Sequence, residues 1–395
     1  MDLFPTIPAA PGSRAPTIAA NAAFVPVGIV TVLLGPMLPS LSAQWSLNYG
    51  QAGFLFTAQF LASMLAVGLS GVLISRCGFR FAMNAGLLAM ALPLAALPFT
   101  SYLQGMACIA LYGAGSGLAV PAANLLVAEV NPTRRSAALN RLNFSWSLGA
   151  VACPFMVAAA ARRNHTALFL LTVSGFLLVV MLGIALMPWK SDDSAAKTNE
   201  QSKRPPINWQ SSALRVLGLL FFLYVGAENA FGGWIASYAK SLTTLSAARA
   251  VMTPSFFYIA LMLGRGLAPF LLRTVDEVKL ARAGILLACA GMASLLFSRS
   301  LLTVAVSVSI AGIGCSAVYP ITIALLSREF GAAASRIGSI MFFAANLGGA
   351  ILPWLVGYSS DHFGGLKIGL AVPLVAALVM YALYGWRWSA LPSPA

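Results

Sequence analysis

Charged residues are scarce in this sequence. Asp, Glu, Lys and Arg make up 9% of its 395 residues, whereas about a quarter of a soluble globular domain is charged. Hydrophobic residues make up 59%, so we predict a polytopic protein embedded in a lipid bilayer. The net charge of +14 would suggest nucleic acid as a partner of a soluble chain. Here the basic residues lie between apolar runs, where they indicate topology, and we expect no nucleic acid partner.

Residues that support catalysis or metal binding are also scarce. The two histidines, His165 and His362, are expected in loops. The five cysteines lie in or beside apolar runs without paired spacing, which indicates neither disulfides nor a metal site. The sequence contains no GxxxxGK[ST] motif, so ATP is not expected to drive its activity. We therefore expect no enzyme, no cofactor and no metal.

Apolar runs set the predicted architecture. A spanning helix needs about 20 mostly apolar residues, and twelve such runs predict an all-α fold of twelve transmembrane helices. A polar stretch at 188–212 predicts a cytoplasmic linker between two six-helix halves, 1–187 and 213–395. The predicted spans are 18–41, 51–75, 81–99, 104–129, 137–161, 167–187, 213–239, 248–272, 279–297, 301–326, 335–359 and 367–388.

Basic residues also predict the orientation. With both termini inside, 18 of the 24 Lys and Arg residues face the cytoplasm, as the positive-inside rule requires. The Pro-rich N-terminal segment lacks the pattern of a cleaved signal peptide, so we expect the first helix to direct insertion. We predict a multi-pass protein of the cell (inner or plasma) membrane with cytoplasmic termini.

The two halves are related by an offset of 199 residues. Spans four and five match spans ten and eleven at nine positions over 42 residues without a gap. Glycines and prolines among these matches fix close helix contacts and kinks. Because an even number of spans separates the repeats, they are parallel, as in a two-halved rocking transporter. The matches are Gly113/Gly312, Gly115/Gly314, Pro121/Pro320, Leu126/Leu325, Ser136/Ser335, Phe144/Phe343, Leu148/Leu347, Gly149/Gly348 and Pro154/Pro353.

One carboxylate lies deep in a predicted span. Glu228 and Asn229 lie near the middle of span seven, followed by Gly232 and Gly233. A carboxylate costs a few kcal/mol in hydrocarbon, so such a group usually faces a wet cavity or a partner and is functional. We predict that Glu228 binds a coupling proton or a substrate hydroxyl, against the alternative that it only holds two helices together. The two glycines predict a bend or a close approach at a binding site.

Other polar residues in the spans are candidates for substrate binding. Sugar recognition needs hydrogen-bonding groups and aromatic faces in a mostly apolar cavity. Arg265 in span eight has three interpretations: a contact at the inner gate or a loop, a side chain reaching the cytoplasmic face, or a site for an anionic substrate. Besides Asn229 and Glu228, the substrate-binding candidates are Gln59, Asn143, Trp146, Tyr319 and Asn346.

The segment GVLISRCGFR after span two resembles the loop motif of the major facilitator superfamily. In that motif, two glycines, an aspartate and two basic residues join the inner ends of helices. Gly71, Arg76, Gly78 and Arg80 match, but the aspartate position is Ser75. The resemblance implies a gating role for these four residues, and the position of Arg265 in span eight makes it a further gating candidate. Glu129, at the inner end of span four, is a candidate to replace the missing aspartate.

Within that superfamily the sequence resembles the fucose-proton symporter family. The likeness lies in GPMLP at 35–39, PAANLLVAEVNP at 121–132, LNRLNFSWSLGA at 139–150, YVGAENAFGGWIASYA at 224–239 and FFAANLGGAILPWLVGYSSD at 342–361. Asn143 and Trp146 match positions that contact sugar in that family; the alternative is that they only form hydrogen bonds between helices. Proton-coupled members carry carboxylates where this sequence has Gly35 and Val120, so their coupling residues are missing, and Glu228 is the deep acidic group that remains.

These expectations converge on a secondary transporter. We expect a monomer that moves a small polar solute, most simply a monosaccharide, by alternating access with proton coupling. Sodium stays open as the coupling ion, because Glu228, Asn229 and helix-end carbonyls could supply oxygen ligands. The alternatives are a proton-driven exporter of lipophilic compounds or metabolites, and a non-transporting membrane sensor. A sensor would usually carry a soluble domain, and the longest predicted loop has only about 25 residues.

Overall fold

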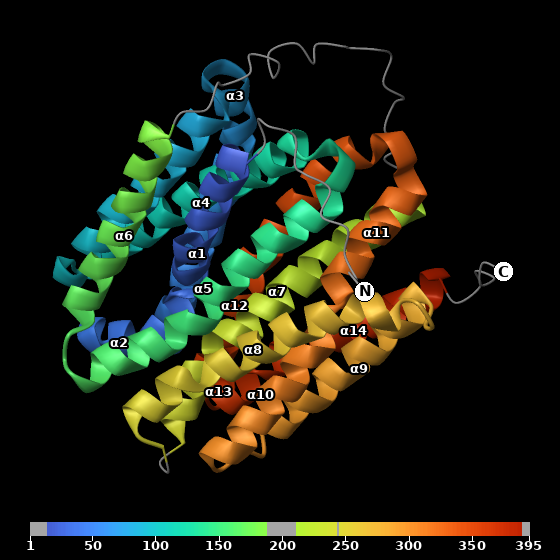
Figure 1. Ribbon diagram of the computed structural model, residues 1–395. Helices are drawn as coiled ribbons and strands as arrows, with labels where there is room; N and C mark the ends of the chain where they lie inside the picture. The colour runs from blue at the N-terminus through green and yellow to red at the C-terminus, as the bar shows by residue number, and fades with distance from the viewer. Residues whose placement is uncertain (1–13, 188–210, 243–244, 389–395) are drawn as a thin grey trace, which may run out of the picture.

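A computed structural model describes residues 14–187, 211–242 and 245–388, and the regular structure in these ranges is helical. Figure 1 shows the first half from blue to green and the second from yellow to red, packed side by side. Most of the predicted linker, 188–212, lies outside the described residues, so its boundaries stay a prediction.

The first half contains α1 Arg14–Val32, α2 Leu34–Trp45, α3 Tyr49–Ala96, α4 Tyr102–Val130, α5 Arg135–Arg162 and α6 Thr166–Leu186. The second contains α7 Ser212–Ser241, α8 Ala247–Leu271, α9 Glu277–Leu295, α10 Leu301–Ser316, α11 Val318–Phe330, α12 Ala334–Phe363, α13 Leu366–Gly369 and α14 Ala371–Trp388.

The twelve predicted spans are present. Eleven helical stretches are long and apolar enough to cross a membrane, and the stretch Tyr49–Phe99 has 51 residues, far more than one crossing needs. It bends at Gly78, whose φ of 82° and ψ of 168° lie outside the helical region and are readily adopted only by glycine. This stretch therefore supplies spans two and three.

Two spans are interrupted next to prolines. Span one consists of α1 and α2, which meet at Leu33, and span ten consists of α10 and α11, which meet at Ala317. Pro36 and Pro320 follow these breaks by three residues. A proline has no N–H to donate to the carbonyl four residues earlier and its ring clashes with that carbonyl, so it interrupts the helix just before itself.

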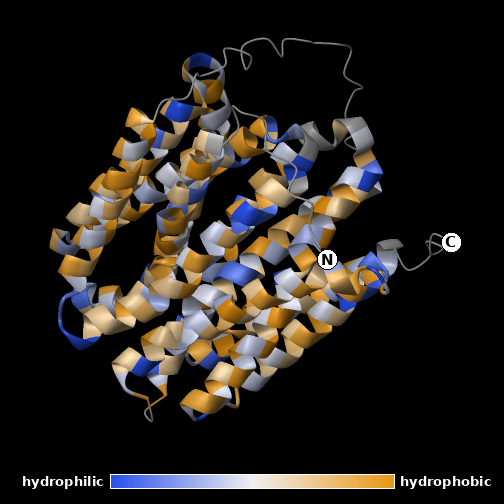
Figure 2. Ribbon diagram, in the orientation of Figure 1, coloured by the Kyte–Doolittle hydropathy of each residue, from blue (hydrophilic) through white to orange (hydrophobic). Residues whose placement is uncertain are grey.

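Apolar side chains cover the outside of the bundle. Leu65 is 72% exposed and Phe297 is 76% exposed. Figure 2 shows hydrophobic residues along the outward surfaces of the helices and hydrophilic residues gathered toward the helix ends. A soluble protein rarely exposes an apolar surface of this extent. The structure is therefore that of a multi-pass membrane protein.

Matched glycines pack the two halves in the same way. A Cβ added to Gly149 of α5 would overlap the carbonyl of Val25 in span one, and a Cβ added to Gly348 of α12 would overlap the carbonyl of Phe222 in span seven. The 199-residue offset matched Gly149 with Gly348, and close helix contact requires the small residue at both places. A second matched pair behaves alike: Gly113 lies against the carbonyl of Gln59, and Gly312 against that of Phe257.

The halves meet closely at only one end of the described bundle. We call the end where α1 and α7 begin the terminal end, and the opposite one the far end. Toward the far end, a Cβ on Gly53 of α3 would lie 2.9 Å from the Cα of Trp354 in α12. Toward the terminal end of the same helix, Cβ atoms on Gly68 and Gly71 would have no neighbour within 4 Å. The interface is therefore closed at the far end and open along α3 toward the terminal end.

Candidate functional site

The deep carboxylate of α7 faces a cation on α8. Glu228 Oε1 lies 3.9 Å from Nη2 of Arg265, and their side chains are 15% and 26% exposed. At this distance the contact is an ion pair rather than a hydrogen bond. Removing one partner of such a shielded pair leaves the other charge uncompensated, which is far more costly than removing both. The structure thus brings together two residues that the sequence placed in different roles.

Aromatic and thiol groups of the second half surround this ion pair. The Tyr224 hydroxyl donates to the carbonyl of Cys315 over 3.0 Å, and its ring stacks on Tyr319 with centroids 5.5 Å apart. A small cavity beside Glu228 lies inside the second half, between α7, the α10–α11 span, α9 and α14; besides Tyr224, Glu228 and Cys315, its lining includes Ala227, Ile285, Ala288, Met292, Val318, Ala377 and Met380.

Of the two outcomes expected at the glycines of span seven, the bend is wrong and the close approach of another segment is found. α7 is an unbroken helix from Ser212 to Ser241, and Asn229 donates from Nδ2 to the carbonyl of Val225 in the same helix over 2.8 Å. Gly233 instead permits a close approach between the halves, because a Cβ on it would lie 2.7 Å from the ring of Phe56 in α3. The glycines thus serve helix packing rather than a bend at a binding site.

Three polar residues of the first half converge at the break in span one. Gln59 donates from Nε2 to the carbonyl of Thr31 over 3.2 Å, and Trp146 donates from Nε1 to the Thr31 hydroxyl over 2.9 Å. The sequence interpretation selected Gln59 and Trp146 but missed Thr31. The sequence feature that could have indicated Thr31 is a single hydroxyl-bearing residue in an apolar run just before GPMLP. Nothing local indicates which distant residues such a hydroxyl contacts.

The remaining amide candidates are bonded to their own helices. Asn143 donates to the carbonyl of Leu139 over 3.0 Å, and Asn346 donates to that of Phe342 over 2.9 Å. Asn143 is exposed and Asn346 is half-buried. A side-chain amide has two donors and two acceptor lone pairs, so one bond to the backbone leaves capacity for a ligand.

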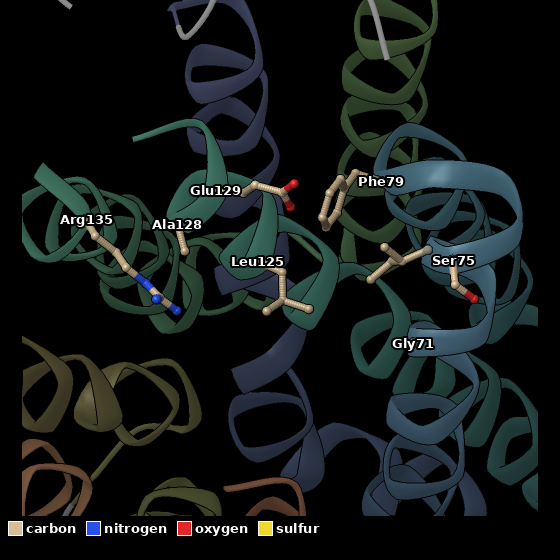
Figure 3. A pocket seen from close by; sticks show the side chains of 8 residues that line it. Gly71, Ser75, Phe79, Leu125, Ala128, Glu129 and Arg135 are labelled. Atoms are coloured by element: carbon tan, nitrogen blue, oxygen red, sulfur yellow. The ribbon is translucent and has the colours of Figure 1, made fainter. Parts of the chain in front are cut away.

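Two of the residues predicted to gate, Gly71 and Glu129, line a pocket near the terminal end. Figure 3 shows Glu129 and Phe79 facing each other across it, with Ser75 and Gly71 on the same helix as Phe79. The Ser75 hydroxyl donates to Val72 of its own helix over 2.9 Å, so it does not replace an aspartate that joins two helices. The pocket is lined by Gly71, Ile74, Ser75, Phe79, Leu125, Ala128, Glu129 and Arg135.

The two arginines of this segment lie differently. Arg80 donates from Nε to the carbonyl of Ile184 over 2.9 Å and from Nη2 to that of Met187, so it binds the last turn of α6. A cation at a helix C-terminus also complements the helix dipole. Arg76 is exposed. A gating role for Gly71, Arg76, Gly78, Arg80, Glu129 and Arg265 stays a prediction.

The sequence matches the family model described as Major Facilitator Superfamily over residues 21–353. The chain belongs to this family. The resemblance inferred from GVLISRCGFR is thereby confirmed, and so is the twelve-span, two-halved fold. Since the family consists of transporters, its match also confirms the prediction that the chain is not an enzyme.

Relatives and a solved structure share most of the chain's length. The sequence is 23% identical to the mouse (Mus musculus) "Sodium-dependent glucose transporter 1A", over 92% of this chain and 94% of the relative. It is 26% identical to a "Glucose/galactose transporter" of Brucella abortus, over 91% of each. The structure matches that of the E. coli "Fucose:proton symporter, FucP" with a TM-score of 0.64 and 18% identity, over 95% of this chain and 99% of the other. The last likeness supports the fold alone.

Proposed function

We propose that this protein is a secondary transporter that moves a monosaccharide across the cell membrane by alternating access, as a monomer. The observation that carries the sugar assignment is the pair of full-length relatives from a mammal and a bacterium, both named for glucose. The neutral amides and Trp146 near the break in span one are consistent with it. Such groups pair with sugar hydroxyls and pack against sugar rings without requiring a charged substrate.

The contacts between the halves support alternating access. A substrate enters from one side at a time when the halves are closed at one end and open at the other. In the described part of the chain, five hydrogen bonds join the halves, and they lie toward the far end. They run from Tyr49 N to Asp361 (3.1 Å), Gly50 N to Asp361 (2.7 Å), Thr57 Oγ1 to Ala350 O (2.7 Å), Lys240 Nζ to Pro39 O (3.2 Å) and Ser255 Oγ to Val151 O (3.0 Å).

The basic residues support a cytoplasmic terminal end. Arg76, Arg273, Lys279 and Arg328 are exposed near this end, as the positive-inside rule expects for the cytoplasmic side. With this orientation the structure is an inward-facing state, closed toward the outside. Glu129 would then lie at the inner gate, where it takes the place of the aspartate that Ser75 replaces.

Glu228 is our candidate for the coupling site. When its carboxylate is ionised, Arg265 balances its charge at 3.9 Å. Protonation would neutralise Glu228 and release Arg265, changing the electrostatics at the junction of α7 and α8 during each cycle. The ionisable groups close by include Tyr224, Tyr258, Tyr319 and Cys315. A proton is favoured over sodium because one carboxylate already paired with a cation is a poor cation site.

Substrate binding is assigned to residues of both halves. Gln59, Asn143 and Trp146 would contact the sugar from the first half. Glu228, Asn229, Tyr319 and Asn346 would do so from the second. In the inward-facing state these two groups would line the path that opens toward the terminal end.

Uptake into proteoliposomes tests the proposal. Labelled hexoses and deoxyhexoses would be offered to the purified protein with an inward proton gradient, with an inward sodium gradient and with neither, using protein-free liposomes as the control. We expect one or a few sugars to accumulate under the proton gradient. Accumulation under sodium alone would contradict proton coupling. Equilibration that ignores both gradients would contradict active transport, and absence of any sugar flux would contradict the substrate class.

A further inference from the structure

The first turn of α3 is capped by a residue from the other half of the molecule. The carboxylate of Asp361, in the last turn of α12, accepts from the backbone N–H of Tyr49 to Oδ1 over 3.1 Å and of Gly50 to Oδ2 over 2.7 Å. More than three hundred residues separate the partners in the sequence. The first N–H groups of a helix have no partner within it, and a carboxylate there also complements the helix dipole.

The helix's own cap leaves these two amides to Asp361. Asn48 accepts from the N–H of Gln51 over 2.7 Å, and the Gln51 side chain accepts from the N–H of Asn48 over 3.1 Å. The N–H of Ala52 already donates to the carbonyl of Asn48. Asn48 and Gln51 therefore form a complete capping box that satisfies every other donor of this turn. The cap of α3 is incomplete without the second half.

The surrounding packing holds the carboxylate at this helix end. A Cβ on Gly50 would lie 3.0 Å from Asp361 Oδ2, and a Cβ on Gly357 would overlap the carbonyl of Tyr49. The rings of Phe54 and Trp354 pack across the same interface with centroids 5.7 Å apart. Opening the far end must therefore break both Asp361 bonds and expose these contacts.

No equivalent bond is expected at two other places where a helix of one half ends beside the start of a helix of the other half. The 199-residue offset places Arg162, a cation, where Asp361 would have its repeat partner at the end of α5, and a cation cannot accept from the first N–H groups of α8. At the terminal end of α3, Ser75 is bonded within its own helix. α12 begins at Ala334 without a side-chain cap.

We propose that Asp361 is a positioning residue that closes the outer gate and biases the empty transporter toward the inward-facing state. The proposal rests on the alternating-access function proposed above. Each time the substrate path opens outward, the Asp361 carboxylate leaves the first turn of α3 and both groups become solvated. In the part of the chain that the structure describes, the hydrogen bonds between the halves lie toward the far end, so the inward-facing state is favoured until substrate binding offsets this difference.

Distances between spin labels test this without any substrate. In a background free of native cysteines, Leu103→Cys and Leu302→Cys place labels at exposed, repeat-related positions at the far end. Cys77, restored alone in that background together with Lys279→Cys, would report the terminal end. We expect Asp361→Asn to raise the ratio of outward-open to inward-open molecules about 5- to 10-fold, the size expected for losing a charged cap. Asp361→Glu, which keeps the carboxylate, should stay close to the parent.

A matched control separates gating from helix stability. Asp276 caps α9 by accepting from Val278 and Lys279, entirely within the second half. Asp276→Asn should leave both label distances unchanged. Unchanged populations in Asp361→Asn, or an equal shift in Asp276→Asn, would overturn the proposal.

Transport kinetics give a second readout. With more molecules open outward, Asp361→Asn should lower the apparent KM for sugar offered from outside, whereas simple damage to the fold would raise KM or lower the maximal rate. An unchanged or raised KM would contradict the proposal that Asp361 closes the outer gate. If the label distances shift but the protein moves no sugar, the gating role of Asp361 is supported and the proposed sugar transport is contradicted.

Discussion

The two halves of this protein share a scaffold but differ in the chemistry at their centres. Gly149 and Gly348 make the same close helix contact. In the first half, however, the central polar groups are neutral and converge on Thr31, whereas in the second half Glu228 and Arg265 form an ion pair. The packing is thus repeated while the central chemistry differs, and this difference supports our proposal that both halves contact the sugar but only the second half carries the coupling charge.

The strongest test of this division is Glu228→Gln. The amide keeps the size of the side chain but cannot gain or lose a proton, so we expect gradient-driven sugar accumulation to disappear while sugar exchange across the membrane continues. The matched control is Glu277→Gln, because Glu277 forms a peripheral ion pair with Arg328 at 3.7 Å and should not affect accumulation. If Glu228→Gln still concentrates sugar, charge coupling is not confined to the second half at this residue.

A second test asks whether the scaffold is as symmetric as the glycine contacts indicate. Gly149→Ala and Gly348→Ala each place a Cβ into a backbone carbonyl, so each should cost about 1–3 kcal/mol or more of stability. We expect similar losses of thermal stability in detergent. Gly183→Ala in α6, whose Cβ would have no neighbour within 4 Å, should be neutral or stabilising. If only one of the two matched variants loses thermal stability, the two halves are similar in sequence but do not pack in the same way at these glycines.

The smallest expected effect sharpens the role of the first half. Trp146→Phe removes the bond to the Thr31 hydroxyl but keeps an aromatic ring, so we expect the KM for sugar to rise about 3- to 10-fold, as the loss of one hydrogen bond implies. The accumulation ratio should not change. Trp45→Phe is the control, since Trp45 donates to Thr100 at the far end over 2.9 Å. An altered accumulation ratio in Trp146→Phe would contradict the division between halves.

Most of the fold followed from the sequence. The twelve apolar runs are found as spans, and the 199-residue offset identified glycines that make equivalent contacts. These features are local, because span length is set by the bilayer and close packing by the absence of a Cβ. The sequence predicted a bend or a close approach at Gly232 and Gly233. The close approach is found, at Gly233 against Phe56 of α3, and the bend is not. A glycine pair alone does not distinguish the two.

The site was less accessible from sequence because its contacts join distant segments. Glu228 stood out through the cost of placing a carboxylate in hydrocarbon, but its partner Arg265 and the role of Thr31 depend on how helices pack. Nothing in the sequence distinguishes Asp361 from other polar residues near the end of a span. Its bonds to Tyr49 and Gly50 become visible only when α3 and α12 are placed side by side.

The most direct measurement is proton movement on addition of sugar. In proteoliposomes without an imposed gradient, the transported sugar should drive proton uptake by the wild-type protein, and none by the Glu228→Gln variant. About one proton per sugar is expected, because one carboxylate is available for coupling in the deep part of the described spans. Sugar entry without proton movement in the wild type, or equal proton movement in the variant, would contradict the assignment of coupling to Glu228.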